Sequence, residues 1–296
     1  MWIGNKVIPI QKVPQRVTLH ALSDWQLESG SCDKKLIRDQ IAEIVNDPSG
    51  GMWAFLGDIE DDDRPSTRSK KAQAFADRPE VLDSESKKYL YYLDKEIIPL
   101  LLPLAKTRLG CIGVLAGHHW KALTRDLNSV QYICNRLTAL SGKKVPYMGQ
   151  MSAWVWLRFR GPNKQSLKKL LHIQHGEGGG QTLASALNKL ELTSRGFEAD
   201  ALIRAHDCKL VSAKFDRLYP KDTECDPVIL HKTVAMLNIG SATRGYVLGR
   251  GDPDYVESAM MRPTSMGNGK LHFDVRGSSL REDPSANWRA DIKIEI

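Results

Sequence analysis

The chain has 296 residues, 42% hydrophobic and 26% charged, a balance that is ordinary for a globular protein and excludes a disordered one. Its net charge of +7 favours polyanionic partners without identifying one. No apolar run approaches the roughly 20 residues that span a bilayer, and the N-terminus lacks the apolar core of a secretory signal. Because the five cysteines form no paired framework, we expect a cytoplasmic protein with reduced thiols and no membrane partner.

Strands and helices alternate along most of the chain. Apolar runs predict strands at 16–25, 50–58, 110–117, 152–161, 168–176, 199–206, 209–219, 226–241, 269–277 and 289–296. Helical spacing of apolar residues predicts helices at 33–47, 69–77, 84–102, 128–140 and 179–192. Alternating units followed by a strand-rich tail indicate a mixed α/β (α+β) protein with two sheets. Since no linker or repeat interrupts the pattern, we expect a single domain over 1–296, with a helical insert at about 66–106 that caps the site.

Acidic and histidine side chains follow five successive apolar strands. These residues are Asp24, Asp58, the pair His118 and His119, His175, and His206. In an open α/β sheet, ligands collect in the crevice outside the carboxyl ends of the strands, so we expect these side chains to converge. Carboxylates and imidazoles together are ligands for zinc, manganese or iron. For the two aspartates the alternative is the capping of a following helix.

At this point the sequence resembles the calcineurin-like metallophosphoesterases. The ordered motifs of that family correspond here to "SDWQ", "LGDIED", "AGHHW", "IQHGEGGG" and "RAHDCK", between about residues 17 and 241. The later stretch 238–273 resembles the tail of phage and prophage members. The resemblance implies a four-layer αββα sandwich, two mixed β-sheets flanked by helices, that hydrolyses phosphate esters with one or two divalent metal ions (Mn, Zn, Fe or Ni).

The resemblance also implies a role for each residue. Asp58 would bridge two metals, and His118, His175 and His206 would complete the second metal position. Asp24 would bind the first metal together with Gln26 and Cys208. His119 would contact the phosphate and protonate the leaving oxygen.

Several positions depart from the family pattern. Gln26 and Cys208 stand where the first metal position has histidines, so we expect either one or two bound metals. Ala205 replaces a glycine, and Trp120 stands where an acidic residue would orient the catalytic imidazole. Asp207 is left with two roles, that of a ligand or that of a support for the ligands.

Other stretches have a functional and a purely structural interpretation. The run Asp61 to Asp63 is either a set of extra ligands or, as we favour, a solvated loop. The glycines of "HGEGGGQT" lack the Lys-Ser/Thr end of a P-loop and predict a tight turn beside His175. Every second position of 154–160 holds Trp154, Trp156, Arg158 or Arg160, a pattern that would suit a base-stacking ribbon. We favour an ordinary strand with an apolar and a basic face. Four further histidines, His20, His172, His231 and His272, lie within strands, and we expect structural roles for them.

Two functions remain. The favoured one is a metal-dependent phosphoesterase that acts on phosphodiesters in the manner of a nuclease, with a metal-activated hydroxide, His119 assisting the leaving group, and nucleic acid among the candidate substrates. The alternative is a degenerate member of the fold that binds a partner with one metal or none and turns over little. Natural substrate, metal identity, exonuclease or endonuclease action and oligomeric state are left open by the sequence.

Overall fold

The computed structural model describes residues 2–61, 82–162, 166–178, 182–221, 228–249, 255–258, 260, 262–277 and 288–296. Its strands are β1 (Trp2–Pro9), β2 (Gln15–Leu22), β3 (Met52–Phe55), β4 (Gly110–Val114), β5 (Ala122–Thr124), β6 (Leu127–Asn128), β7 (Ser152–Arg160), β8 (Ser166–Gln174), β9 (Ala201–Arg204), β10 (Val211–Lys221), β11 (Val228–Asn238), β12 (Gly269–Gly277) and β13 (Trp288–Glu295). Its helices are α1 (Lys34–Val45), α3 (Ser84–Tyr92), the π-helical η2 (Leu93–Ile97), α4 (Ile98–Lys106), α5 (Ser129–Ser141), α6 (Leu183–Gly196) and α7 (Tyr255–Ser258).

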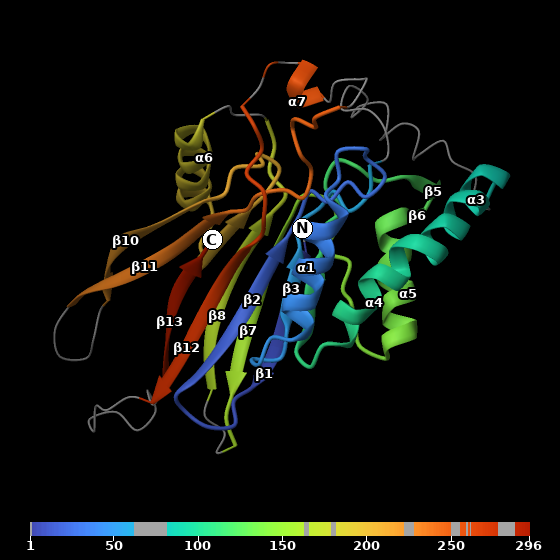
Figure 1. Ribbon diagram of the computed structural model, residues 1–296. Coiled ribbons are helices and arrows are strands. Elements are labelled where there is room, and N and C mark those ends of the chain that lie inside the picture. The colour runs from blue at the N-terminus through green and yellow to red at the C-terminus, as the bar shows by residue number, and fades with distance from the viewer. Residues whose placement is uncertain are drawn as a thin grey trace.

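The long strands form two mixed sheets, which lie face to face (Figure 1). The first sheet has the order β1-β7-β8-β9-β11-β10, with β8, β9 and β11 mutually parallel. The second has the order β13-β12-β2-β3-β4, with β2, β3 and β4 parallel. Parallel neighbours end at the same edge of a sheet, so the loops that follow these strands gather at one end of the sandwich.

Three hydrophobic clusters of buried residues define the layers. The largest joins the inner faces of both sheets, for example Leu19 and Phe273 with Val155 and Ile173. A second joins α1, α4 and α5 to the outer face of β2, β3 and β4. A third joins α6 to β9 and β11. The order helix, sheet, sheet, helix confirms the expected αββα sandwich of a mixed α/β protein.

The predicted elements agree with most of the observed ones. The strand β1 was not predicted from the sequence, and its partner β7 lies far along the chain. The predicted helix at 69–77 lies outside the described residues. Of the expected insert, residues 84–106 form α3, η2 and α4, and α4 joins the helical layer through Leu101 and the Leu104 carbonyl, which accepts from Trp53 Nε1.

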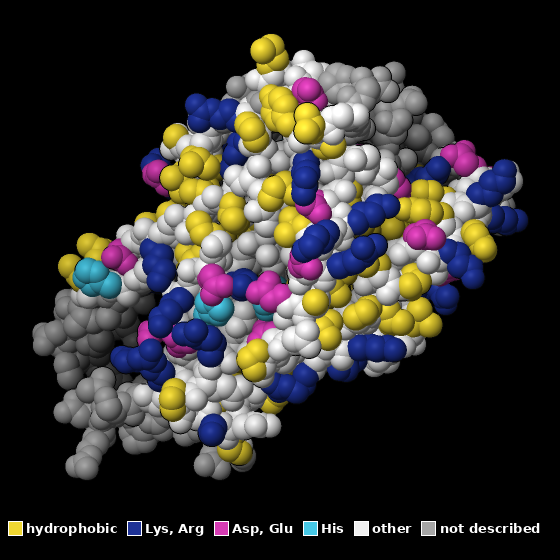
Figure 2. Space-filling model, viewed as in Figure 1, with side chains coloured by type: hydrophobic (Ala, Val, Ile, Leu, Met, Phe, Trp, Pro, Cys, Tyr) yellow, Lys and Arg dark blue, Asp and Glu magenta, His cyan; other side chains and the backbone are white. Residues whose placement is uncertain are grey.

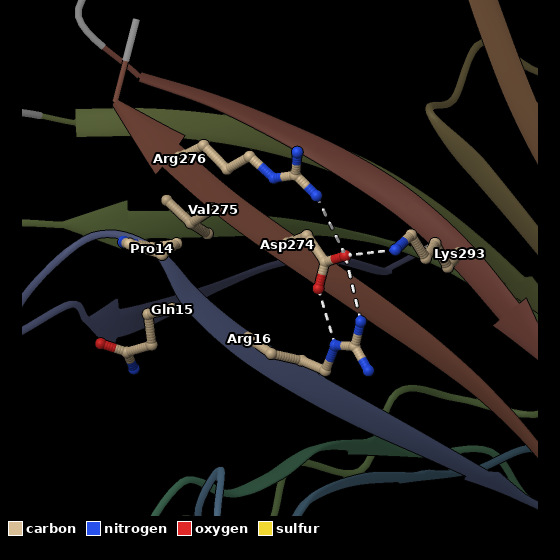
Figure 3. A pocket seen from close by; sticks show the side chains of 7 residues that line it. All are labelled: Pro14, Gln15, Arg16, Asp274, Val275, Arg276 and Lys293. Atoms are coloured by element: carbon tan, nitrogen blue, oxygen red, sulfur yellow. Dashed lines mark hydrogen bonds and ion pairs between the residues drawn. The ribbon is translucent and has the colours of Figure 1, made fainter.

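A ladder of charged side chains crosses the outer face of β2, β12 and β13. Asp274 accepts two hydrogen bonds from Arg16, of 2.7 and 3.1 Å, and lies 2.9 Å from Lys293 Nζ and 3.9 Å from Arg276 (Figure 3). These residues line a pocket of about 260 Å³. On the face seen in Figure 2, Lys and Arg side chains are interspersed with Asp and Glu over β12 and β13.

Within the described part of the chain, no helix is both long enough and apolar enough to cross a membrane.

Candidate metal centre

Four of the predicted ligands meet at the end of the sandwich where the parallel strands finish. Asp58 follows β3, His118 follows β4, His175 follows β8, and His206 follows β9. Each offers one ligand atom, and these four atoms lie within 4.8 Å of one another. Three imidazoles and a carboxylate in so small a space form a donor set suited to zinc, manganese or iron.

The three imidazole rings contact one another directly. Ring centroids are separated by 4.4 Å between His118 and His206, 4.8 Å between His118 and His175, and 5.0 Å between His175 and His206. Nδ1 of His118 lies 3.2 Å from Nδ1 of His206. Nδ1 of His175 lies 2.8 Å from the Leu56 carbonyl, a contact that leaves Nε2 as the atom facing the cluster.

Asp58 is the centre of the cluster. Its side chain is 1% exposed, and its Oδ1 accepts hydrogen bonds from the backbone N–H groups of His118 (2.6 Å) and His119 (2.9 Å). Its Oδ2 forms an ion pair with His175 Nε2 at 3.0 Å, and in the described structure neither atom has a hydrogen bond to any other group. Two buried polar atoms that have only each other and point into one cluster are what a bound cation would satisfy, so the residues fit a metal.

The backbone is strained at the ligand positions. Positive φ angles, in the left-handed region that non-glycine residues rarely adopt, occur at Asp24 (53°), Gln26 (44°), Asp58 (61°), His206 (74°) and Cys208 (49°). In the described part of the chain, Met260 is the one other non-glycine residue with a positive φ. Strained residues persist where the surrounding structure holds them, and they concentrate at functional sites. The strain therefore marks five of the seven predicted metal ligands.

Glycines bring the strand-end turns close together. Gly57 and Gly117 have φ angles of 115° and 77°. A Cβ atom on Gly57 would lie 2.6 Å from His175 Nδ1, and one on Gly117 would lie 2.2 Å from Asp58 Oδ1. Only glycine allows both the backbone angles and the close approach of the loops that carry the ligands.

Burial and mutual contact shift the pKa values within the cluster. Burial acts to raise the pKa of Asp58, but the charge and hydrogen bond of His175 outweigh it and hold the pKa well below its usual range. Burial likewise acts to lower the pKa of His175, but Asp58 raises it to about 9. The pair thus shares a proton at neutral pH, and a cation that binds His175 Nε2 must displace it.

The residues predicted for the first metal position form a different arrangement. Asp24 is buried, its Oδ2 accepts from the backbone N–H of His206 at 3.2 Å, and burial raises its pKa to about 6. Oε1 of Gln26 accepts from the Thr243 hydroxyl at 3.4 Å. Burial raises the pKa of the Cys208 thiol well above its usual value, and Sγ donates to the His206 carbonyl at 3.5 Å. Two of the three potential metal ligands at this position, the Gln26 amide and the Cys208 thiol, are therefore neutral.

His119 lies beside the cluster and is partly exposed. Its side chain is 14% exposed, and its Nε2 lies 3.9 Å from Asp58 Oδ2. Its Nδ1 lies 3.4 Å from Oδ1 of Asp61. The Asp61 side chain is 32% exposed and lies next to this imidazole, and Asp61 is not one of the four residues of the cluster, so the solvated loop that we favoured stays a prediction. Trp120 is buried in the hydrophobic cluster under the helices, and Asp62 and Asp63 lie outside the described residues.

Asp207 lies one residue after His206 but pairs with two cationic side chains. Its carboxylate lies 2.6 Å from Lys189 Nζ and 3.1 Å from Arg204 Nε. Asp207 is thus engaged by two cationic side chains and is not one of the four residues of the cluster. The turn after His175 is tight as expected, since a Cβ on Gly176 would lie 2.9 Å from the Ala205 carbonyl.

Sequence reasoning missed the loop that holds Asp24. The Ser241 hydroxyl donates to the Asp24 carbonyl at 2.9 Å, and the Thr243 hydroxyl lies 3.3 Å from the same oxygen. The pairing depends on chain segments more than 200 residues apart. No local pattern in the sequence predicts that these hydroxyls contact the Asp24 carbonyl.

The four histidines assigned structural roles lie away from the cluster. His172 is buried and stacks on Phe197, with ring centroids 4.4 Å apart. His20 contacts Asp47, and His272 contacts Thr18 and Glu295. His231 is exposed on β11.

Comparisons with known proteins give likenesses in structure alone. No family model and no curated protein matches the sequence. Solved structures similar to the chain include a single mutant of Vps29 from Entamoeba histolytica (10% identity, 95% of this chain and 100% of that chain, TM-score 0.33) and wild-type Vps29 complexed with Zn²⁺ from the same organism (11%, 94% and 99%, 0.33). Another is GAP50, described as the anchor in the inner membrane complex of Plasmodium (10%, 93% and 88%, 0.35). Because these TM-scores are low, the assignment of the site depends on its own geometry.

Proposed function

We propose that the chain is a metal-dependent phosphoesterase of the calcineurin-like type that hydrolyses phosphodiesters. The observation that carries the proposal is the meeting of Asp58, His118, His175 and His206, from four different strands, within 4.8 Å. The tail resemblance to phage members and the net charge of +7 favour nucleic acid as the substrate class.

The cluster residues would hold the metal, with Asp58 Oδ2 and His175 Nε2 as its buried ligand atoms. A bound divalent cation neutralises phosphate charge and lowers the pKa of water to the physiological range. The backbone N–H groups of His118 and His119 fix the Asp58 carboxylate, so the cluster keeps its shape without rearrangement.

His119 is placed to handle protons. Its partly exposed ring lies at the edge of the cluster, where a leaving alkoxide oxygen needs a proton. The Asp61 carboxylate beside Nδ1 favours the tautomer with a proton on that atom and stabilises the protonated ring. Nε2 is then the atom that exchanges a proton with the substrate.

The test is the hydrolysis of bis(p-nitrophenyl) phosphate with manganese, zinc or nickel added, or with EDTA. We expect metal-dependent turnover that falls by about 100-fold or more in His119→Ala, as is typical for loss of a general acid. His231→Ala is the matched control, since that histidine is exposed and distant from the cluster in sequence and in fold. Absence of turnover with every metal would contradict the proposal.

A second function, that of a binding protein with one metal and little turnover, is favoured by the neutral donors at the first metal position. Gln26 and Cys208 supply an amide oxygen and a thiol of raised pKa where two imidazoles would attract a cation more strongly. The double variant Gln26→His/Cys208→His separates the two functions. It should raise both bound metal and turnover sharply if the chain is a degenerate member, and change turnover little if the enzyme works as it is.

A further inference from the structure

The strand β7 presents two different faces. Its residues Ala153, Val155, Leu157 and Phe159 lie in the hydrophobic core between the sheets. Because side chains alternate along a strand, residues 154, 156, 158 and 160 lie on the outer face of the sheet. That outer set is Trp154, Trp156, Arg158 and Arg160.

The neighbouring strands complete this outer face, which we call the β7 face. Its four rows, read across β1, β7 and β8 from the register of the sheet, are Ile3, Trp154 and His172; Asn5, Trp156 and Leu170; Val7, Arg158 and Lys168; Pro9, Arg160 and Ser166. Three of these side chains are cationic, and none of the twelve is acidic. A face with one sign of charge attracts a polyanion.

The β7 face is open to solvent over much of its area. The helix α6 packs on β9, β10 and β11, and on the β7 face Ile3 is 69% exposed and Val7 42% exposed. Trp154 is engaged by His172 and Phe197, at ring distances of 5.0 and 5.5 Å. Trp156 is partly exposed and, in the described part of the chain, belongs to none of the three hydrophobic clusters.

The charges of the β7 face differ from those around the pocket of Figure 3. Around the pocket of Figure 3, Arg16 and Lys293 already have a counter-ion in Asp274. Near the β7 face, the acidic side chain of Glu198 is itself engaged by Lys232 at 2.5 Å. The cations of the β7 face are therefore better suited to an external anion than those of the pocket.

We propose that the β7 face binds single-stranded nucleic acid. Arg158, Arg160 and Lys168 contact the phosphates, and Trp156 stacks on an unpaired base. Cationic side chains that follow the backbone, combined with an aromatic platform, are the means by which proteins bind single strands without reading sequence. An acidic peptide would match the charges but has no planar bases to use the Trp156 ring.

The direction of β8 relates this face to the metal cluster. Leu170, beside Trp156, lies five residues before His175, which is about 17 Å at roughly 3.4 Å per residue. A strand bound along the rows from Arg160 to Trp156 thus runs toward the end of the sandwich where the metal ligands lie. The two sites are separate, so binding at the β7 face can be measured without hydrolysis.

The experiment is fluorescence anisotropy of a labelled oligothymidylate with the full chain in EDTA, at several salt concentrations. We expect Trp156→Ala to weaken binding at least about fivefold, the lower end of the effect of losing one stacked base. Arg158→Glu and, as a second charge reversal, Lys168→Glu should weaken binding and reduce its salt dependence. Lys88→Glu and Tyr91→Ala, both on exposed positions of α3, are the controls and should bind as the wild type does.

Two results would overturn the inference. One is oligothymidylate binding that is absent, or unchanged in all three variants of the β7 face while circular dichroism shows them folded. The other is a duplex bound as tightly as the single strand with no effect of Trp156→Ala, because a paired base cannot stack on the ring. Since EDTA removes the cation on which the proposed hydrolysis depends, neither result bears on the phosphoesterase activity.

Discussion

The substitution Gly117→Ala should disable the metal cluster without touching a ligand. Gly117 has a φ of 77°, where a side chain costs about 1 kcal/mol. The added Cβ would lie 2.2 Å from Asp58 Oδ1, whereas ordinary contacts begin at 3.4 Å, so the carboxylate has to retreat by about 1 Å. Displacement of that size should weaken metal binding by about 10- to 100-fold, the range seen when the support of a ligand is lost.

Gly142→Ala is the matched control. Gly142 has a similar φ of 67° at the end of α5, and a Cβ there would meet no atom within 4 Å. This substitution should lower the free energy of unfolding by the same amount, about 1 kcal/mol, because the side chain disfavours the positive φ. It should leave metal binding intact. Isothermal titration with manganese and urea unfolding in EDTA measure the two quantities. Wild-type metal affinity in Gly117→Ala, or an equal loss in Gly142→Ala, would refute the argument that close approach of the loops positions Asp58.

Two further predictions concern histidines. Asp61→Asn removes the carboxylate that lies 3.4 Å from His119 Nδ1. It should lower the turnover of bis(p-nitrophenyl) phosphate about 10-fold or more and leave the metal content unchanged. An unchanged kcat would show that Asp61 does not act through His119. Burial lowers the pKa of His172 from 6.5 to about 4, so below pH 6.5 unfolding takes up a proton and stability falls, by up to about 3 kcal/mol at pH 4. In His172→Phe, the free energy of unfolding measured with urea should depend less on pH between 6.5 and 4. A dependence as steep as that of the wild type would show that the lowered pKa of His172 is not its cause.

The sequence by itself determined the elements and the chemistry available at their ends. Apolar runs with period two and helical spacing predicted most strands and helices, because each element must bury one face. The polar residues that interrupt these runs, such as Asp58 and His175, were visible for the same reason. Parallel strands then imply that such residues share an edge, which is why a metal cluster could be predicted without coordinates.

Tertiary structure alone decided which side chains meet. The short distance from Asp61 to His119 and the loop of Ser241 on Asp24 join segments far apart in the chain. The strand β1 was missed because its place beside β7 is set by pairing across some 150 residues. The exposure of Trp156 could not be predicted from the sequence either. Side chains alternate between the two faces of the strand, and only the packing of the second sheet shows which face stays open. Local propensity and period act over a few residues, whereas contacts across the sandwich depend on how the two sheets pack.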